Sequence, residues 1–233
     1  MAIHKTDAVL LRRQEIRETS LILIAFTPDL GKIQGLIKGV RGARAAVPWV
    51  LEPLTHQAIV VYERRRSPLS LISSCDLIDA FDPIRRDLTR TAYASFCVDL
   101  VNSMTEMGDP HPEIFRLLLN SLRALAEGAD PRSVARFVEV HLLKGSGLLP
   151  AGSSLGLSPE GRLSLEQMHQ TPFEEVRCLH LVQAVEGELR MVFQRLFWSA
   201  LGRELKSRTF LQALGVERPI QREAIVGHEV SAS

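Results

Sequence analysis

The stretch LILIAFTPDLGKIQGLIKGVRGAR, residues 21–44, contains two runs of β-forming residues joined by a short polar turn. Side chains alternate between the two faces of a strand, so the second run places Ile33 and Ile37 on one face and Lys32 and Lys38 on the other. The apolar face suits the interior of a small barrel. The two lysines then face outward, as a row of phosphate contacts or as an ordinary solvated surface.

Similar β-rich runs, separated by turn residues, continue through residues 1–80 without any sustained helical period. Five strands in a segment of this size fit a closed or partly open barrel such as the OB-fold, with an SH3-like barrel as the alternative. The predicted strands are Ala8–Arg13, Leu21–Thr27, Lys32–Val40, His56–Glu63 and Leu69–Leu77.

The pattern becomes helical after Asp82, where Pro83 stands in a first-turn position that tolerates proline. We therefore predict an α+β protein with two domains, an OB-fold domain over residues 1–80 and an all-helical domain over residues 81–215. Apolar residues recur at every third or fourth position in the helical part. The predicted helices span residues 84–107, Pro112 to Gly128, a third segment opened by Asp130 and Pro131, and 186–205.

Two segments lack such a pattern. Residues 145–171 are rich in Gly, Ser and Pro, which predicts a long loop with at most a short hairpin over 159–162. Residues 216–233 are polar, and we expect a disordered tail.

Composition excludes several classes of protein. The 233 residues carry a net charge of only +1, so a surface for nucleic acid must come from local clusters of Lys and Arg. There is no secretory signal pattern and no apolar run of the roughly 18 residues that a membrane span needs, which predicts a cytoplasmic protein. Cys75, Cys97 and Cys178 lie far apart without a CxxC pair, which argues against a disulfide framework and a thiolate zinc site.

Basic residues cluster at two further places in the barrel domain. Arg41 and Arg44 continue the row of lysines on a glycine-rich segment, where backbone amides can approach phosphates closely. Arg64, Arg65 and Arg66 stand at the turn before the last predicted strand, a place where OB-folds commonly hold nucleic acid. A charged turn is more often simply solvated, and both interpretations stay open.

On the third predicted helix, Arg132 and Arg136 lie one turn apart and off the buried stripe, so they can receive a partner's carboxylates. A solvated face with Arg136 and Glu139 as an ion pair is the simpler interpretation.

Sequence signatures of catalysis are missing. The chain has no GxxxxGK[ST] loop, no GxSxG elbow and no HExxH helix. Asp76, Asp79 and Asp82 near the domain boundary can in principle hold a metal for hydrolysis, but acids that cap a helix explain them more simply. We therefore predict a protein that is not an enzyme.

Three segments, taken together, resemble one family. ETSLILIAFTPDLGKIQGLIKGVRGAR at 18–44, with LEPLT at 51–55, is similar to the amino-terminal domain of the RecO family of DNA repair and recombination mediator proteins. ARFVEVHLLKGSGLLP at 135–150 and LGRELKSRTFL at 201–211 resemble helical-domain and carboxy-terminal segments of that family.

This resemblance implies an OB-fold and a helical domain that bind single- and double-stranded DNA and anneal complementary strands. It further implies action with RecR, contact with the acidic tail of the single-strand-binding protein, and indirect help to RecA in a nucleoid-associated, cytoplasmic role. By position, Lys32, Lys38, Arg41 and Arg44 match the family's basic DNA-contacting stretch. Arg136 matches an arginine where the acidic tail is thought to dock. The alternative is an adaptor whose barrel binds a protein and not DNA.

One departure from the family concerns its metal. Many RecO proteins carry a four-cysteine zinc module after the segment that matches GLLP, whereas residues 150–171 contain no cysteine. His169 alone cannot supply the four ligands of structural zinc. We expect no zinc and no other cofactor, with the loop 145–171 in place of the module.

Overall fold

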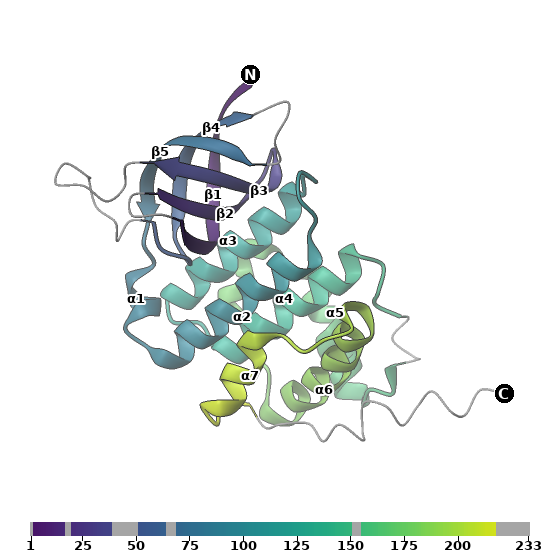
Figure 1. The fold of residues 1–233 in the computed structure, drawn as a ribbon. Helices are drawn as coiled ribbons and strands as arrows, with labels where there is room; N and C mark the ends of the chain where they lie inside the picture. Colours follow the sequence, from purple (N-terminus) through teal and green to yellow (C-terminus); the bar gives the residue numbers. More distant parts are fainter. Residues whose placement is uncertain (1, 17–19, 39–50, 64–68, 151–154, 218–233) are drawn as a thin grey trace.

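The computed structural model describes residues 2–16, 20–38, 51–63, 69–150 and 155–217. Figure 1 shows a β-barrel at one end of the molecule, with the helices packed together beneath it. The strands all precede the helices in the chain, so the structure confirms the predicted α+β class with a five-stranded amino-terminal part.

Five strands close into a barrel in the order β1-β2-β3-β5-β4, and β4 pairs back with β1. Neighbouring strands are antiparallel except β3 and β5, which run parallel. This order is that of the OB-fold, the predicted architecture, and not that of the SH3-like alternative. The strands are β1 (Ala2–Ile16), β2 (Ser20–Thr27), β3 (Gly31–Lys38), β4 (His56–Glu63) and β5 (Ser70–Asp79).

Strand β1 is longer than the sequence pattern predicted because it serves two neighbours. Its first part pairs with β4, from Ala2 opposite Glu63 to Val9 opposite His56, and its second part pairs with β2. Inside the barrel, Ile37 is buried and Ile33 is partly buried, as strand alternation predicted. They pack with the other inward-facing side chains, which include Ala8, Leu10, Leu21, Leu23, Ala25, Ile59, Val61 and Ile72.

Two of the helices, over residues 112–126 and 131–145, begin where local signals predicted. Asp130 caps its helix by accepting a hydrogen bond from the Ser133 backbone N at 3.0 Å, and Gly128 follows the preceding helix with a φ of 99°. The helices are α1 (Asp82–Arg85), α2 (Leu88–Met104), α3 (Pro112–Ala126), α4 (Pro131–Gly145), α5 (Pro159–Gln170), the 3-10 helix η3 (Phe173–Cys178), α6 (Gln183–Leu201) and α7 (Lys206–Ala213).

Three predicted boundaries were wrong. The loop expected over 145–171 contains α5, which Ser158 caps through a hydrogen bond from the Gly161 backbone N at 3.0 Å. This helix buries few apolar side chains, Leu165 and Met168 among them, so its periodic signal is weak. The helix expected over 84–107 is divided into α1 and α2, and the one over 186–205 ends at Gly202, whose φ is 63°.

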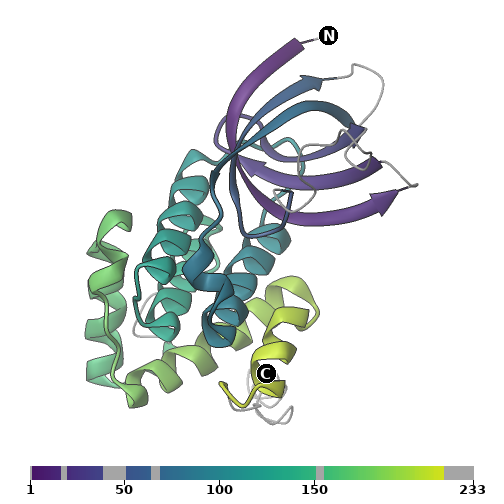
Figure 2. The same ribbon diagram turned by 90° about the vertical axis from the view of Figure 1, so that its left-hand side faces the viewer.

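The outer face of the barrel forms part of the same apolar core as the helices. Val9 and Leu11 of β1, Phe26 of β2 and Leu54 join buried residues of α2, α3 and α4 in one continuous cluster. Figure 2 shows this side of the barrel resting on the upper ends of the helices. One sheet surface of the barrel is therefore interior to the protein, not open to solvent.

Lys32 shows what this packing does to a polar residue. Its side chain lies on the outer face of β3, as predicted, but the prediction that it faces solvent is wrong because the residue is only 8% exposed. The Lys32 Nζ donates hydrogen bonds to the carbonyl oxygens of Asn102 at 2.6 Å and Thr105 at 2.5 Å, at the carboxyl end of α2. A cation is favourable there because the last carbonyl groups of a helix lack helical partners and carry partial negative charge.

Close backbone packing accompanies this contact. The Gly108 N donates a hydrogen bond to the Lys32 carbonyl oxygen at 2.9 Å, directly after α2. Gly31 has a φ of +65°, and a Cβ atom at this position would stand 2.0 Å from the Asp109 carbonyl oxygen. The start of β3 is thus attached to the connection between α2 and α3 by both side chain and main chain.

Replacing Lys32 by Met should lower the free energy of unfolding by about 2 kcal/mol, because two carbonyl acceptors at the junction lose their donor. Lys38→Met is the matched control, since Lys38 is exposed at the other end of the same strand and should change stability by less than about 0.5 kcal/mol. Urea denaturation followed by circular dichroism measures both. Equal stabilities of the two variants would contradict the structural role of Lys32.

Candidate nucleic-acid interface

Of the two lysines that were predicted to form a basic row on β3, only Lys38 faces solvent. Lys38 is exposed and lies opposite Ser20 across the β2–β3 pairing. Lys32 is turned toward α2, and burial lowers its pKa, an effect that the nearby charge of Glu106 partly offsets. A strand of nucleic acid that contacts Lys38 therefore cannot use Lys32 as its next cation along β3.

The other predicted DNA-contacting residues cannot be placed. Arg41, Arg44, Arg64, Arg65 and Arg66 lie outside the described residues, so their role stays a prediction.

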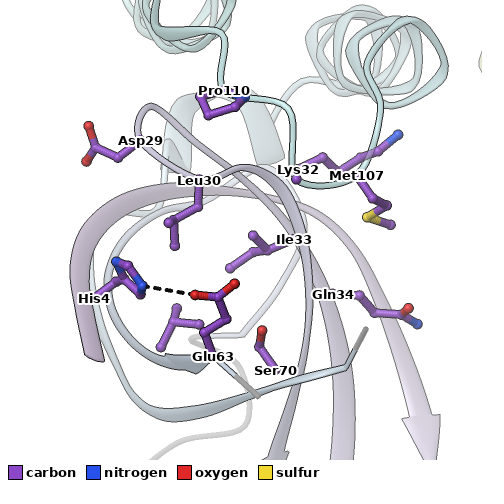
Figure 3. A pocket seen from close by; sticks show the side chains of 12 residues that line it. His4, Asp29, Leu30, Lys32, Ile33, Gln34, Glu63, Ser70, Met107 and Pro110 are labelled. Atoms are coloured by element: carbon purple, nitrogen blue, oxygen red, sulfur yellow. Dashed lines mark ion pairs between the residues drawn. The ribbon is translucent and has the colours of Figure 1, made fainter. Parts of the chain in front are cut away.

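Figure 3 shows a pocket of about 360 Å³ at the mouth of the barrel, next to the connection between α2 and α3. His4 and Glu63 point into it and approach one another at 3.5 Å, while Lys32 is directed away from its interior. Asp29 adds a second carboxylate to the lining. A pocket that contains two acids and directs its lysine elsewhere is poorly suited to phosphates.

A second hollow lies where the barrel meets the helices, and we call it the junction groove. Its volume is about 630 Å³, within the range of pockets that hold ligands. Three cationic side chains, Arg12 of β1, Arg203 and Lys206, stand among its lining residues. Sequence reasoning missed this group because Arg12 is far in the chain from Arg203 and Lys206, and only the fold brings all three to one groove. The remaining lining residues are Leu11, Pro53, Leu54, Ser95, Val98, Asp99, Asn102 and Ser207.

Arg136 is not on the surface, so the prediction that it lies off the buried stripe of its helix was wrong. It is fully buried and surrounded by carboxylates. Its Nε lies 2.5 Å from Glu139 Oε2, its Nη1 3.0 Å from Glu186 Oε1 and its Nη2 3.2 Å from Glu217 Oε1. A partner's acidic tail cannot reach this guanidinium without displacing those contacts. Arg132, one turn earlier, is half-buried.

A second arginine completes this buried charge cluster. Arg208 of α7 donates from Nη2 to Glu139 Oε1 at 2.5 Å, and its Nη1 lies 3.5 Å from Glu217 Oε2. The guanidinium also stacks over Phe96, 4.7 Å from the ring centroid. Burial raises the pKa of Glu139, and the two arginines oppose that rise. The ion pairs of this cluster thus connect α4, α6, α7 and the segment after α7.

The position of Glu217 shows that the predicted start of the disordered tail is wrong. The disordered segment was expected from residue 216, yet Glu217 is only 4% exposed and forms two ion pairs inside the protein. Residues 218–233 lie outside the described residues. The sequence pattern missed this contact because a single acid after a helix resembles any polar tail.

One of the three acids near the domain boundary, Asp79, serves local structure. Asp79 Oδ1 accepts a hydrogen bond from the Phe81 backbone N at 2.7 Å, and Phe81 has a φ of 48°. In the part of the chain that the structure describes, no group of three or more His, Cys, Asp or Glu side chains could hold a metal ion. In the position of the family's zinc module, α5 buries Leu165 and Met168 instead of presenting a described set of zinc ligands. No helix among the described residues combines the length and apolar character needed to cross a membrane.

The geometry defines a class of protein, an OB-fold joined to a helical domain with a basic groove at the junction. Comparisons specify the family. Residues 1–81 match the model of the recombination protein O N terminal domain, and residues 85–154 match that of the recombination protein O C terminal domain. The chain belongs to the RecO family.

Curated relatives are named DNA repair protein RecO. The one from Syntrophus aciditrophicus is 33% identical over 64% of this chain and 58% of its own length. The one from Caldicellulosiruptor saccharolyticus is 35% identical over 64% of this chain and 61% of its own length. The matched part thus spans less than two thirds of these two relatives. A relative from Pelotomaculum thermopropionicum is 27% identical over 92% of this chain and 96% of its own length.

Arg136→Met should lower the free energy of unfolding by roughly 3–5 kcal/mol, because it leaves buried carboxylates without their partner. Arg132→Met, one helical turn away and half-buried, should change it by less than about 0.5 kcal/mol. Guanidinium denaturation at neutral pH gives both values. A stability loss as small for Arg136→Met as for Arg132→Met would show that the cluster contributes nothing to folding.

Proposed function

We propose that this protein is a non-catalytic DNA repair mediator of the RecO type. It binds single- and double-stranded DNA through sequence-independent phosphate contacts and anneals complementary strands. With RecR, it helps RecA replace the single-strand-binding protein on gapped DNA. The observation that carries this proposal is the agreement of two independent features. The residues that match the RecO amino-terminal model, 1–81, are those that close into the OB-fold barrel.

The barrel's DNA-facing surface includes Lys38 in this proposal, together with the sequence-predicted Arg41, Arg44 and Arg64–Arg66. Lys32 is left out, because its ammonium group is engaged by the end of α2. Among the aromatic residues that the structure describes in the barrel, Phe26 is fully buried and Tyr62 is partly buried. Binding therefore depends on phosphates more than on base stacking, which makes it sensitive to salt and nearly indifferent to sequence.

The proposed contact with the single-strand-binding protein also loses one of its predicted residues. Arg136 cannot receive the acidic tail of the single-strand-binding protein while three carboxylates surround it. Arg132 remains a proposed contact, since part of its surface is accessible at the start of α4.

An annealing assay on complementary strands coated with the single-strand-binding protein tests the proposal. Wild-type protein should accelerate annealing, and Lys38→Glu/Arg41→Glu should reduce that acceleration about tenfold, since reversed charges repel phosphates. Coating the strands with a single-strand-binding protein that lacks its acidic tail should also slow the reaction. If wild-type protein has no effect on annealing and no affinity for DNA, the protein-binding adaptor is the correct function.

The zinc proposal has a direct test. Elemental analysis of the purified protein should find far less than one zinc per chain, because the described residues supply no set of ligands. A preparation treated with chelator should show unchanged thermal stability for the same reason. Stoichiometric zinc that survives dialysis would refute the proposal.

A further inference from the structure

The walls of the junction groove come from parts of the chain that are distant in sequence. Arg12 and Leu11 of β1 line one side, Asp99 and Asn102 of α2 line another, and the start of α7 closes it. In Figure 2, α7, drawn in yellow, lies below the barrel. The groove therefore exists only when both domains are docked.

A bulge in β1 directs two consecutive side chains into the groove. Neighbouring side chains of a regular strand point to opposite faces, yet Leu11 and Arg12 both line the groove. The pairing of β1 with β2 shifts register between Leu10 and Arg12, which is the signature of an extra residue in the strand. Leu11 then joins the apolar core beneath the groove, while Arg12 stays exposed at its rim.

Positive charge dominates the groove. Among the described residues, Arg12 and Lys206 form no ion pair and are exposed. Arg203 donates one hydrogen bond to the Ser103 Oγ at 3.0 Å, which leaves most of its guanidinium available. The one acid of the lining, Asp99, accepts hydrogen bonds from the Ser207 backbone N at 3.3 Å and its Oγ at 2.8 Å. Three cations against one engaged carboxylate form a site for an anion.

The groove also adjoins the barrel surface proposed to bind DNA. Arg12 pairs with Ile24 of β2, which pairs with Gln34 of β3, the strand that ends at Lys38. Three cations at separate points of one groove suit a chain that has an anionic group at every unit. A nucleic-acid strand has this regular charge, whereas an acidic peptide needs only one local pocket.

We propose that the junction groove binds the phosphodiester backbone of a nucleic-acid strand, with Arg12, Arg203 and Lys206 as phosphate contacts. This inference rests on the proposed DNA-binding function and extends the bound strand from the barrel to the helical domain. Because both domains contact one strand, binding also favours their docked arrangement. The contacts are to phosphates, so they add affinity without sequence preference.

Fluorescence anisotropy with a labelled single strand, measured over a range of salt concentrations, tests the groove. Arg12→Glu/Lys206→Glu should weaken binding about tenfold or more and reduce the log-log salt slope by about 1.4, since each lost phosphate contact removes about 0.7. The neutral variant Arg12→Gln/Lys206→Gln should show the same loss of slope with a smaller loss of affinity. Arg162→Glu/Arg177→Glu is the control of equal charge, on α5 and η3 away from the groove.

The outcomes separate the groove from the proposed function. Binding by the groove variants equal to wild type, while Lys38→Glu/Arg41→Glu binds weakly, would overturn the groove and leave the function intact. An equal loss of affinity in the Arg162→Glu/Arg177→Glu control would show that the effect comes from net charge alone. This result would also overturn the groove proposal. Retained DNA binding with lost affinity for an acidic, Phe-ended peptide would assign the groove to a protein partner instead. Thermal melts of the groove variants should match wild type, because Arg12 and Lys206 are exposed.

Discussion

The barrel of this protein cannot stand alone in its present form, because the outer face of β1 and β2 is apolar. Val9, Leu11 and Phe26 need cover, and α2 and α3 supply it. Once that cover is in place, Lys32 is largely shielded from water and its amino group needs hydrogen-bond acceptors, which the end of α2 provides. The packing of the two domains thus sets the role of Lys32 and creates the junction groove.

Within the helical domain, the buried charge cluster imposes a second constraint. Burying a guanidinium costs free energy unless carboxylates surround it closely, and Glu139, Glu186 and Glu217 provide these carboxylates around Arg136 and Arg208. These acids come from separate elements, so the cluster defines how α4, α6 and α7 come together. An ionic core of this kind is directional, whereas apolar packing alone allows many arrangements.

The candidate DNA surface was predicted in part. Strand alternation correctly assigned Ile33 and Ile37 to the barrel interior and Lys38 to its exterior. It also assigned Lys32 to the exterior, which is true of the barrel but not of the whole protein. The groove cations form no cluster along the sequence, because Arg12 and Lys206 line one groove only in the folded protein.

The sequence by itself determined the five strands, the starts of α3 and α4, and the family. Alternation marked the strands, capping residues such as Asp130 marked helix starts, and ordered family segments indicated a RecO protein. Only the tertiary structure decided which charged residues are exposed to solvent. A periodic pattern tells on which side of its own strand or helix a residue stands, and it cannot tell what covers that side. Lys32, Arg136 and Glu217 are polar residues that distant segments bury, so their surroundings follow from long-range packing.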